Sequence, residues 1–349
     1  MKKIAGSSLP FLESDCMDYG SNVMLVAKTD ECGVYKIENE TGEGVMTIYE
    51  ILPGIQVMYN DFHMEYAESD FEIKDDNWLY IDHCREGRME TISEGIGEKT
   101  LWANCLDVDI RQHHKGINRF PTSHFHGITI GFFLPDAQKS LETQFSGFPV
   151  SLEKLREKYC ADSTPHIIEA SKEIDAVFSQ MYRLPHHIQV IYLRIKIIEL
   201  LLYLDYLSLS EQEAEKTYFY RTDVEKARVI AERMEKYPEN HYTISQLSDM
   251  YGTSESALKS CFKNEFGMPL YTYLQSCRIQ KAAGLLIRQG NMKIEDAALA
   301  VGYESAGKFT AASKTITGVT PSEYKKHPFA RPIGFSDGEQ NTDMEEDAD

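Results

Sequence analysis

Apolar residues change their spacing along the chain. From about residue 40 to 135, apolar and polar residues alternate over short runs, such as LDVDI at 106–110 and GITIGFFL at 127–134. Turn residues separate these runs, for example Pro53-Gly54 and the GIG at 95–97. Alternation with period two indicates half-buried strands, and several short strands at this spacing predict a small barrel or sandwich of the cupin-like kind. The first 40 residues show no clear pattern.

After Pro149 the apolar spacing becomes helical. Ser151 and the Thr164-Pro165 pair are helix-start signals, and Pro185 opens a third helix that we expect to end near Leu207. The apolar stripe of this helix consists of Ile188, Ile191, Ile195, Ile198 and Leu202. Such a stripe fits packing against the protein's own barrel and a dimer seam equally well, so both alternatives remain open.

The remaining chain divides into a linker, a helical domain and a tail. SLSEQEAEK at 208–216 is polar and acidic, and TDVE at 222–225 has the spacing of a capping box that begins a new helix. Beyond Pro328 the chain is acidic and nearly free of large apolar residues, which predicts disorder. We therefore predict an α+β protein in four segments. They are a β-rich domain at 1–148, a helical segment at 149–220, an all-α domain at 221–328 and a disordered tail at 329–349.

The all-α domain contains one plan twice. In TISQLSDMYGTSESALKSCFKNEFG at 243–267, a capping box starts a short helix, Gly252 ends it and a second helix follows. IEDAALAVGYESAGKFTAASKTITG at 294–318 repeats this order around Gly302. The segment 269–290 joins the two helix-turn-helix units, and a helix of ~20 residues spans ~30 Å. Since successive major grooves on one face of DNA lie ~34 Å apart, this spacing places two reading helices in neighbouring grooves.

Specific phrases strengthen this interpretation. They are FKNEFGMPLYTYL, RIQKAAGLL, the AAxxVGYES of the second unit, the KF in its second helix and the closing GVTPSEYK. Through them residues 241–327, about a quarter of the chain, resemble the DNA-binding domain of the AraC/XylS family of transcription regulators. The resemblance implies binding to promoter DNA, RNA polymerase as a partner if the protein is an activator, and an N-terminal domain that senses a small-molecule effector or forms a homodimer.

A second and looser resemblance concerns the N-terminal domain. Region 45–135, with IDHCREGRME and FPTSHFHGITIGF, is similar to the sensor domain of siderophore-regulator-like members. This similarity does not identify the effector, and the effector-binding residues stay unassigned.

The first unit carries the side chains suited to reading bases. Its second helix turns Leu258 and Phe262 inward, so helical periodicity puts the polar residues on the opposite face. These polar residues are Ser256, Lys259, Ser260 and Lys263. Lys259 can donate to guanine and the serines to either kind of edge, whereas Lys263 is placed for a phosphate.

The second unit has fewer side chains that can hydrogen-bond a base. Phe309 faces inward, and the predicted outward residues at the bases are Gly307, Thr310 and Ala311, with Lys308 and Lys314 left for phosphates. None of the three forms two hydrogen bonds with one base, although Thr and Ala methyl groups can contact a thymine methyl. We therefore expect the first unit to specify the sequence and the second to anchor the protein.

The second unit also departs from the family pattern at Ser313, where relatives commonly carry a large aromatic residue. Removing a buried aromatic side chain typically costs ~3–5 kcal/mol unless neighbours refill the space. Ile316 and Val319 are the candidates for filling it.

Charge and composition limit the function. The net charge of −19 opposes general attraction to phosphates, but it is unevenly distributed. Residues 1–220 hold 20 Lys and Arg against 36 Asp and Glu, residues 221–328 hold 15 against 12, and the tail holds 1 against 7. A mildly basic module is thus attached to an acidic body, which makes binding depend on specific contacts.

The chain shows no sign of secretion or membrane insertion. Seven cysteines without a CxxC pair are typical of a reducing cytoplasm. No apolar stretch reaches ~20 residues, and no apolar segment follows Lys2-Lys3, so we expect a cytoplasmic protein without a membrane partner.

A metal site is the main rival to a DNA-binding function. His124 and His126 have the spacing of ligands on one strand face, sharing the parity of Ile128. GITIGFFL supplies no third ligand, and the distant candidates are Glu90, His83 and His113. We therefore predict neither a metal nor another cofactor. The aromatic residues Trp78, Tyr80 and Trp102 belong either to the core or to the wall of a small-molecule cavity.

No GxSxG, P-loop, GxGxxG or kinase phrase occurs, so no catalytic residue is predicted and the protein is not expected to be an enzyme. The favoured function is a sequence-specific DNA-binding regulator with a sensing N-terminal domain. The alternative is a metal-binding cupin-like enzyme whose C-terminal helices are a non-functional appendage.

Overall fold

A computed structural model describes most of the chain between residues 17 and 326. Outside the described residues lie 1–16, 19–21, 30–31, 70–71, 74–76, 94–96, 112–114, 162–164, 169–170, 183–188, 208–220, 267, 318 and 327–349. The predicted linker, the predicted helix start at Pro185 and the acidic tail therefore fall outside the described part.

The N-terminal region is built from three antiparallel sheets. The largest has eight strands in the order β14-β11-β8-β13-β5-β4-β3-β2, a second has four in the order β10-β9-β12-β6, and β1 pairs with β7. The strands are β1 (Met17–Asp18), β2 (Val23–Lys28), β3 (Cys32–Asn39), β4 (Gly42–Leu52), β5 (Ile55–His63), β6 (Tyr66–Ser69), β7 (Glu72–Ile73), β8 (Trp78–Gly87), β9 (Met89–Ser93), β10 (Gly97–Leu101), β11 (Leu106–Asp109), β12 (Gly116–Arg119), β13 (Phe125–Phe133) and β14 (His166–Ile168). Strands thus begin well before residue 40.

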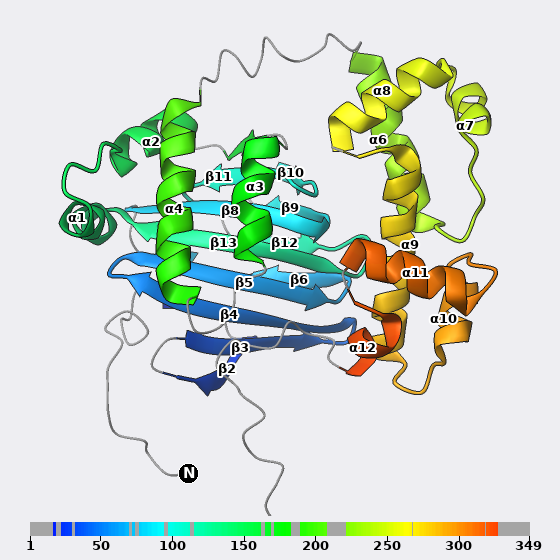
Figure 1. The fold of residues 1–349 in the computed structure, drawn as a ribbon, viewed down its shortest axis with the longest axis horizontal. Helices are drawn as coiled ribbons and strands as arrows, with labels where there is room; N and C mark the ends of the chain where they lie inside the picture. Colours follow the sequence, from blue (N-terminus) through cyan, green and yellow to red (C-terminus); the bar gives the residue numbers. More distant parts are fainter. Residues whose placement is uncertain are drawn as a thin grey trace, which may run out of the picture.

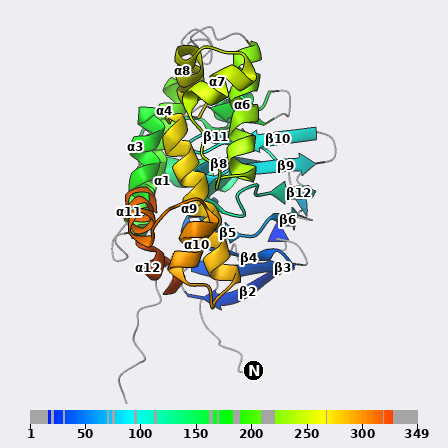
Figure 2. The ribbon, with the colours of Figure 1, turned by 90° about the vertical axis from the view of Figure 1, so that its right-hand side faces the viewer.

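The two larger sheets face each other, and helices cover the outer face of the eight-stranded sheet (Figures 1 and 2). In strand β8, alternate residues point to the two faces of the sheet. Leu79 and Ile81 point to the helices and join the main hydrophobic core, whereas Tyr80 and Asp82 point into a cavity between the sheets. Because both faces are buried, several polar side chains of these strands, such as Asp82, are buried in the cavity wall. The domain is a sandwich, one of the two predicted forms.

The first helices depart from the sequence-based boundaries. Helix α1 (Leu134–Gln144) follows β13 directly, so the helical segment begins before residue 149. Helix α2 (Leu152–Tyr159) starts at the predicted cap, since the Ser151 hydroxyl accepts from the Lys154 amide. The predicted helix start at Thr164-Pro165 is wrong because 166–168 form β14, which pairs with β11 at the edge of the large sheet. Helix α3 (Lys172–Met181) begins only after Ser171.

Helix α4 (Gln189–Tyr206) packs on the sheet by a face other than the predicted stripe. Its buried residues include Leu193, Ile197, Leu200, Leu201 and Leu204. Within the stripe, Ile191, Ile195 and Leu202 face solvent, exposed by 65%, 53% and 42%, whereas Ile198 packs partly against the core and Ile188 lies outside the described residues. Packing on the sheet therefore leaves a second apolar face of α4 uncovered within the described part of the chain.

The C-terminal region is entirely helical where it is described. It contains α6 (Arg221–Lys236), α7 (Ile244–Tyr251), α8 (Glu255–Phe266), α9 (Leu270–Arg288), α10 (Ile294–Ala300), α11 (Ala306–Thr317) and α12 (Pro321–Lys326). Thr222 was expected to cap the first helix, but α6 already includes Arg221. The long helix α9 contributes its first half to a core with α6, α7 and α8, and its second half to a separate core with α10 and α11. Two units joined by one helix therefore form the domain, as the duplicated plan predicts.

Each unit turns on a glycine with a left-handed backbone. Gly252 has φ 60° and Gly302 has φ 85°. A side chain at residue 252 meets nothing within 4 Å, but at residue 302 a Cβ atom lies 2.5 Å from the Glu239 carbonyl oxygen. The first turn is thus constrained only by its own backbone, whereas the second packs against the α6–α7 connection.

These turns predict different costs for one substitution. Gly252→Ala adds the left-handed penalty alone, ~1–2 kcal/mol, while Gly302→Ala adds overpacking of a further ~1–3 kcal/mol. Urea unfolding of both variants measures the difference. Equal losses of unfolding free energy would show that the close approach at Gly302 does not constrain the fold.

Candidate functional site

The predicted reading face of α8 is on the surface of the structure. Ser256, Lys259, Ser260 and Lys263 are all exposed, while Leu258 and Phe262 are buried in the first core. The Ser254 hydroxyl accepts from the Ala257 amide at 3.2 Å and so begins the helix. The ammonium of Lys259 lies 3.4 Å from the Glu255 carboxylate, an exposed pair that a base edge can displace.

The corresponding face of α11 is small and flat. Gly307 and Ala311 are exposed and Thr310 is half-buried, while Phe309 packs inward against Tyr303. Lys308 and Lys314 are exposed, and Lys308 pairs with Glu304 at 2.6 Å. A Cβ atom at residue 307 would meet nothing within 4 Å, so no packing in the described structure requires glycine there. The bare backbone leaves room for a close approach by DNA.

Ser313, the position of the absent aromatic residue, is buried beside the N-terminal domain. Its hydroxyl donates to the Val319 carbonyl at 3.0 Å. It lines a cavity of about 20 Å³ whose walls include Glu86 and His124 of the sandwich and Tyr324 of α12. Ile316 packs partly into the second core and Val319 is 37% exposed, so neither occupies that cavity. The refilling of the aromatic position by these two residues stays a prediction.

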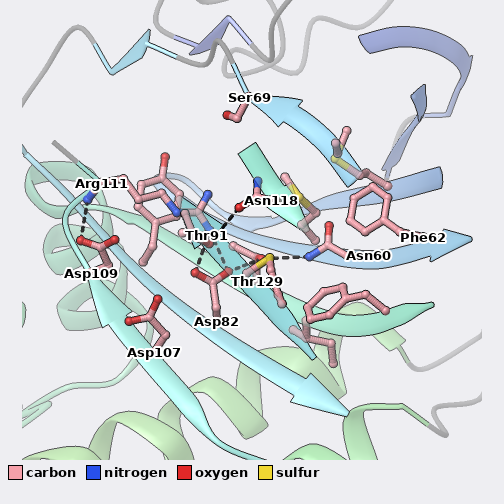
Figure 3. Close-up of a pocket in the computed structure, with 18 of the residues that line it drawn as sticks. Asn60, Phe62, Ser69, Asp82, Thr91, Asp107, Asp109, Arg111, Asn118 and Thr129 are labelled. Atoms are coloured by element: carbon pink, nitrogen blue, oxygen red, sulfur yellow. Dashed lines mark hydrogen bonds and ion pairs between the residues drawn. The ribbon is translucent and has the colours of Figure 1, made fainter. Parts of the chain in front are cut away.

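A larger cavity of about 140 Å³ lies between the two sheets of the sandwich (Figure 3). Charged groups gather at one end of it. Arg111 donates twice to Asp82, at 2.7 and 2.8 Å. Lys99 donates to Asp107 and, at 3.3 Å, to Asp109. Three carboxylates thus share two cations.

The charged end retains unused hydrogen-bonding capacity. Asp107 Oδ1 and the Tyr80 hydroxyl are buried and have no hydrogen-bond partner among the described residues. Burial raises the pKa of Asp107 to about 7, although Lys99 opposes the shift. The other end is apolar, with Met46, Met58 and Phe62 among its lining residues. The cavity therefore suits a small molecule with a hydrogen-bond donor and an apolar part.

Sequence reasoning overlooked this charged cluster. In LDVDI only the apolar residues were assigned a face, yet Asp107 and Asp109 are as buried as Leu106 and Val108. The signal in the sequence is a pair of acidic residues at alternate positions of an otherwise apolar strand.

The three aromatic residues considered as core or cavity wall have different positions. Trp78 is buried, Tyr80 lines the cavity, and Trp102 packs against Phe266 of α8 with ring centroids 4.8 Å apart.

The two histidines of the HxH motif point to different neighbours. His126 belongs to β13, whereas His124 lies just before the strand, which begins at Phe125. The His126 ring contacts Tyr182, with centroids 5.2 Å apart. His124 instead lies beside His63, with their Nδ1 atoms 3.2 Å apart.

The candidate third ligands lie elsewhere: Glu90 pairs with Arg88, His83 stacks on Phe178, and His113 lies outside the described residues. The residues that do approach His124 are Asp61 and His63. One potential ligand atom from each of the three lies within 4.8 Å of the others. The missed signal is the DFH of β5, where alternate residues share a face.

Within the described part of the chain, no helix combines the length and apolarity needed to cross a membrane.

Comparison with known proteins supports the assignment of the C-terminal region. A family described as "Helix-turn-helix domain" matches residues 247–327. A putative AraC-like transcription regulator of Streptomyces lividans is 36% identical over 91 residues, 26% of this chain and 30% of that protein. One of Streptomyces antibioticus is 33% identical over 91 residues, with the same two coverages of 26% and 30%.

The match thus spans less than a third of either relative. A solved structure of ToxT K231A from Vibrio cholerae covers 78% of this chain and 97% of its own, at 15% identity and a TM-score of 0.32. The C-terminal region of this chain is a helix-turn-helix domain similar to that of AraC-like transcription regulators.

Proposed function

We propose that the whole protein is a sequence-specific, cytoplasmic transcription regulator that binds promoter DNA through both helix-turn-helix units. The observation that carries this proposal is the duplicated unit. Helices α8 and α11 each bury one face in a separate core and leave the other accessible, and α9 links the two units. RNA polymerase is a further partner if the regulator is an activator. No enzymatic activity is included in the proposal.

The two units contribute differently in this proposal. Helix α8 supplies Lys259 and two serines, which can hydrogen-bond base edges. Helix α11 supplies methyl groups and exposed backbone near Gly307, with lysines for the phosphates. Sequence specificity therefore comes mainly from the half-site under α8.

Substitutions of two neighbouring lysines test this division within α8. Lys259→Ala removes a base contact, so affinity for the bound site falls by ~1–3 kcal/mol and discrimination at one base pair is lost. Lys263→Ala removes a phosphate contact, so the affinity for all sequences falls alike. The slope of the logarithm of the binding constant against the logarithm of the salt concentration falls by ~1. Fluorescence anisotropy on sites recovered by sequencing protein-bound genomic DNA measures both effects.

A scan of every base pair in that site tests the role of α11. We expect large losses of affinity only in the half under α8. Equally strong specificity under α11 contradicts the anchoring role, and absence of sequence preference in both halves contradicts the proposed function.

We further propose that the sandwich binds an effector in its 140 Å³ cavity. The unused Asp107 oxygen and Tyr80 hydroxyl favour a ligand that brings a donor, such as an ammonium or hydroxyl group. The apolar end accommodates the rest of the molecule.

Substitution of Asp107 tests the effector site. In a thermal-shift screen of small amines and polyols, a ligand that stabilises the wild type should lose at least ~10-fold in affinity with Asp107→Asn, since a charge-assisted hydrogen bond contributes ~1.5–3 kcal/mol. Glu68→Gln, at the exposed edge of the same cavity, serves as the control. Equal binding by Asp107→Asn would place the ligand elsewhere.

Finally, we propose that the uncovered face of α4 mediates homodimerisation. Ile191 and Ile195 lie one turn apart and are more than half exposed. Paired α4 helices bury both residues, which supports a two-helix seam.

The double variant Ile191→Ser/Ile195→Ser should be monomeric in sedimentation equilibrium at concentrations where the wild type is dimeric. Val229→Ser, on α6, removes a comparably exposed apolar residue and should leave the dimer intact. A monomeric wild type, or a double variant that still dimerises, rules out this seam.

A further inference from the structure

A buried cluster of ionisable side chains lies where the sandwich meets α12. Asp61 and His63 belong to β5, and His124 directly precedes β13. His63 is 1% and His124 4% exposed. Helix α12 lies beside this end of the sheets (Figure 1), and its Tyr324 hydroxyl is 3.0 Å from His63 Nε2.

The contacts form a chain with a carboxylate at each end. Asp61 Oδ1 lies 3.0 Å from His63 Nε2. His63 Nδ1 lies 3.2 Å from His124 Nδ1, and His124 Nε2 lies 3.3 Å from Glu86 Oε2. The two imidazole rings are therefore surrounded by groups that can hold a metal ion or orient its ligands.

The spacing of the donor atoms suits a metal ion. Zinc binds imidazole nitrogen at ~2.0–2.1 Å in a tetrahedral arrangement, which puts two ligand atoms ~3.3 Å apart. The Nδ1 atoms of the two histidines are separated by 3.2 Å, and a ligand atom of Asp61 lies within 4.8 Å of one from each histidine. A mixture of imidazole and carboxylate ligands is one of the donor sets that zinc binds in proteins.

The residues around the cluster contact the histidines as the residues that support metal ligands commonly do. A metal-binding histidine usually donates its other ring nitrogen to a carboxylate, which fixes the orientation of the ring. Glu86 has this relation to His124, and the Arg85 guanidinium lies 3.2 Å from Glu86 Oε1. The adjoining cavity of about 20 Å³, lined by Glu86, His124 and Ser313, is large enough for one water molecule.

We propose that Asp61, His63 and His124 form a binding site for a divalent transition-metal ion of the zinc class, with Glu86 orienting His124. Tyr324 lies over the site from the C-terminal domain, and the cavity beside it extends to Ser313 of α11. The bound ion therefore strengthens the contact between the sandwich and the second helix-turn-helix unit. This site is independent of DNA binding, so either proposal can fail without the other.

Metal titration of the full-length protein tests the site. After chelator treatment and its removal, isothermal titration with ZnCl₂ should show one ion per chain. His63→Gln and His124→Gln should each lower the affinity at least ~100-fold, because each removes a ligand. His166→Gln serves as the control, since its strand β14 lies at the edge of the large sheet, with β11, β8 and β13 between it and β5. Bound Co²⁺ should give the visible absorption of a tetrahedral site.

Glu86→Gln provides a milder change if a histidine variant does not fold. Loss of the carboxylate that orients His124 should lower the affinity for Zn²⁺ ~10–100-fold while all three ligands remain. Hydrogen exchange should show that Zn²⁺ slows the amides of α12 in the wild type and has no such effect in His124→Gln. The proposal is overturned if the wild type binds no ion. It is also overturned if both histidine variants bind Zn²⁺ as the wild type does.

Discussion

A buried ion pair between Arg88 of the sandwich and Glu235 of α6 holds the two domains in their relative positions. Their charged atoms lie 2.9 Å apart, and both side chains are almost fully buried. Trp102 lies under the guanidinium at 4.5 Å, and Tyr273 of α9 donates to the carboxylate. Burial raises the pKa of Glu235 to about 7, although Arg88 opposes the shift. Removing one partner would leave a buried charge without compensation, so the pair favours a single docking arrangement.

A second interdomain contact lies at the other half of α9. There Tyr324 of α12 reaches His63, and Ser313 of α11 faces the sandwich across a small cavity. The two helix-turn-helix units thus touch the sandwich at different places. A change at the first contact acts on the core beneath α8, and a change at the second acts on the core beneath α11. The sandwich therefore contacts each helix-turn-helix unit through a separate set of residues.

Predictions from the sequence succeeded where one local pattern was sufficient. The capping box at Thr243 and Gln246 is present with both hydrogen bonds, and Gly252 ends α7 in a left-handed conformation. They failed where a distant partner decided the structure. Thr164-Pro165 has the form of a helix start, but pairing with β11 makes the following residues a strand. The stripe on α4 was identified correctly as apolar, yet an equally apolar second face packs on the sheet.

The sequence by itself determined the duplicated helix-turn-helix plan, because caps, turn glycines and helical periodicity act over a few residues. It also determined that α11 has few side chains able to hydrogen-bond a base, since side-chain chemistry does not depend on folding. Only the tertiary structure brought Asp61 and His63 to His124, and Asp82 to Asp107, because strand pairing places residues side by side that are distant in the sequence. The same holds for the space at Ser313, which depends on how closely another domain approaches.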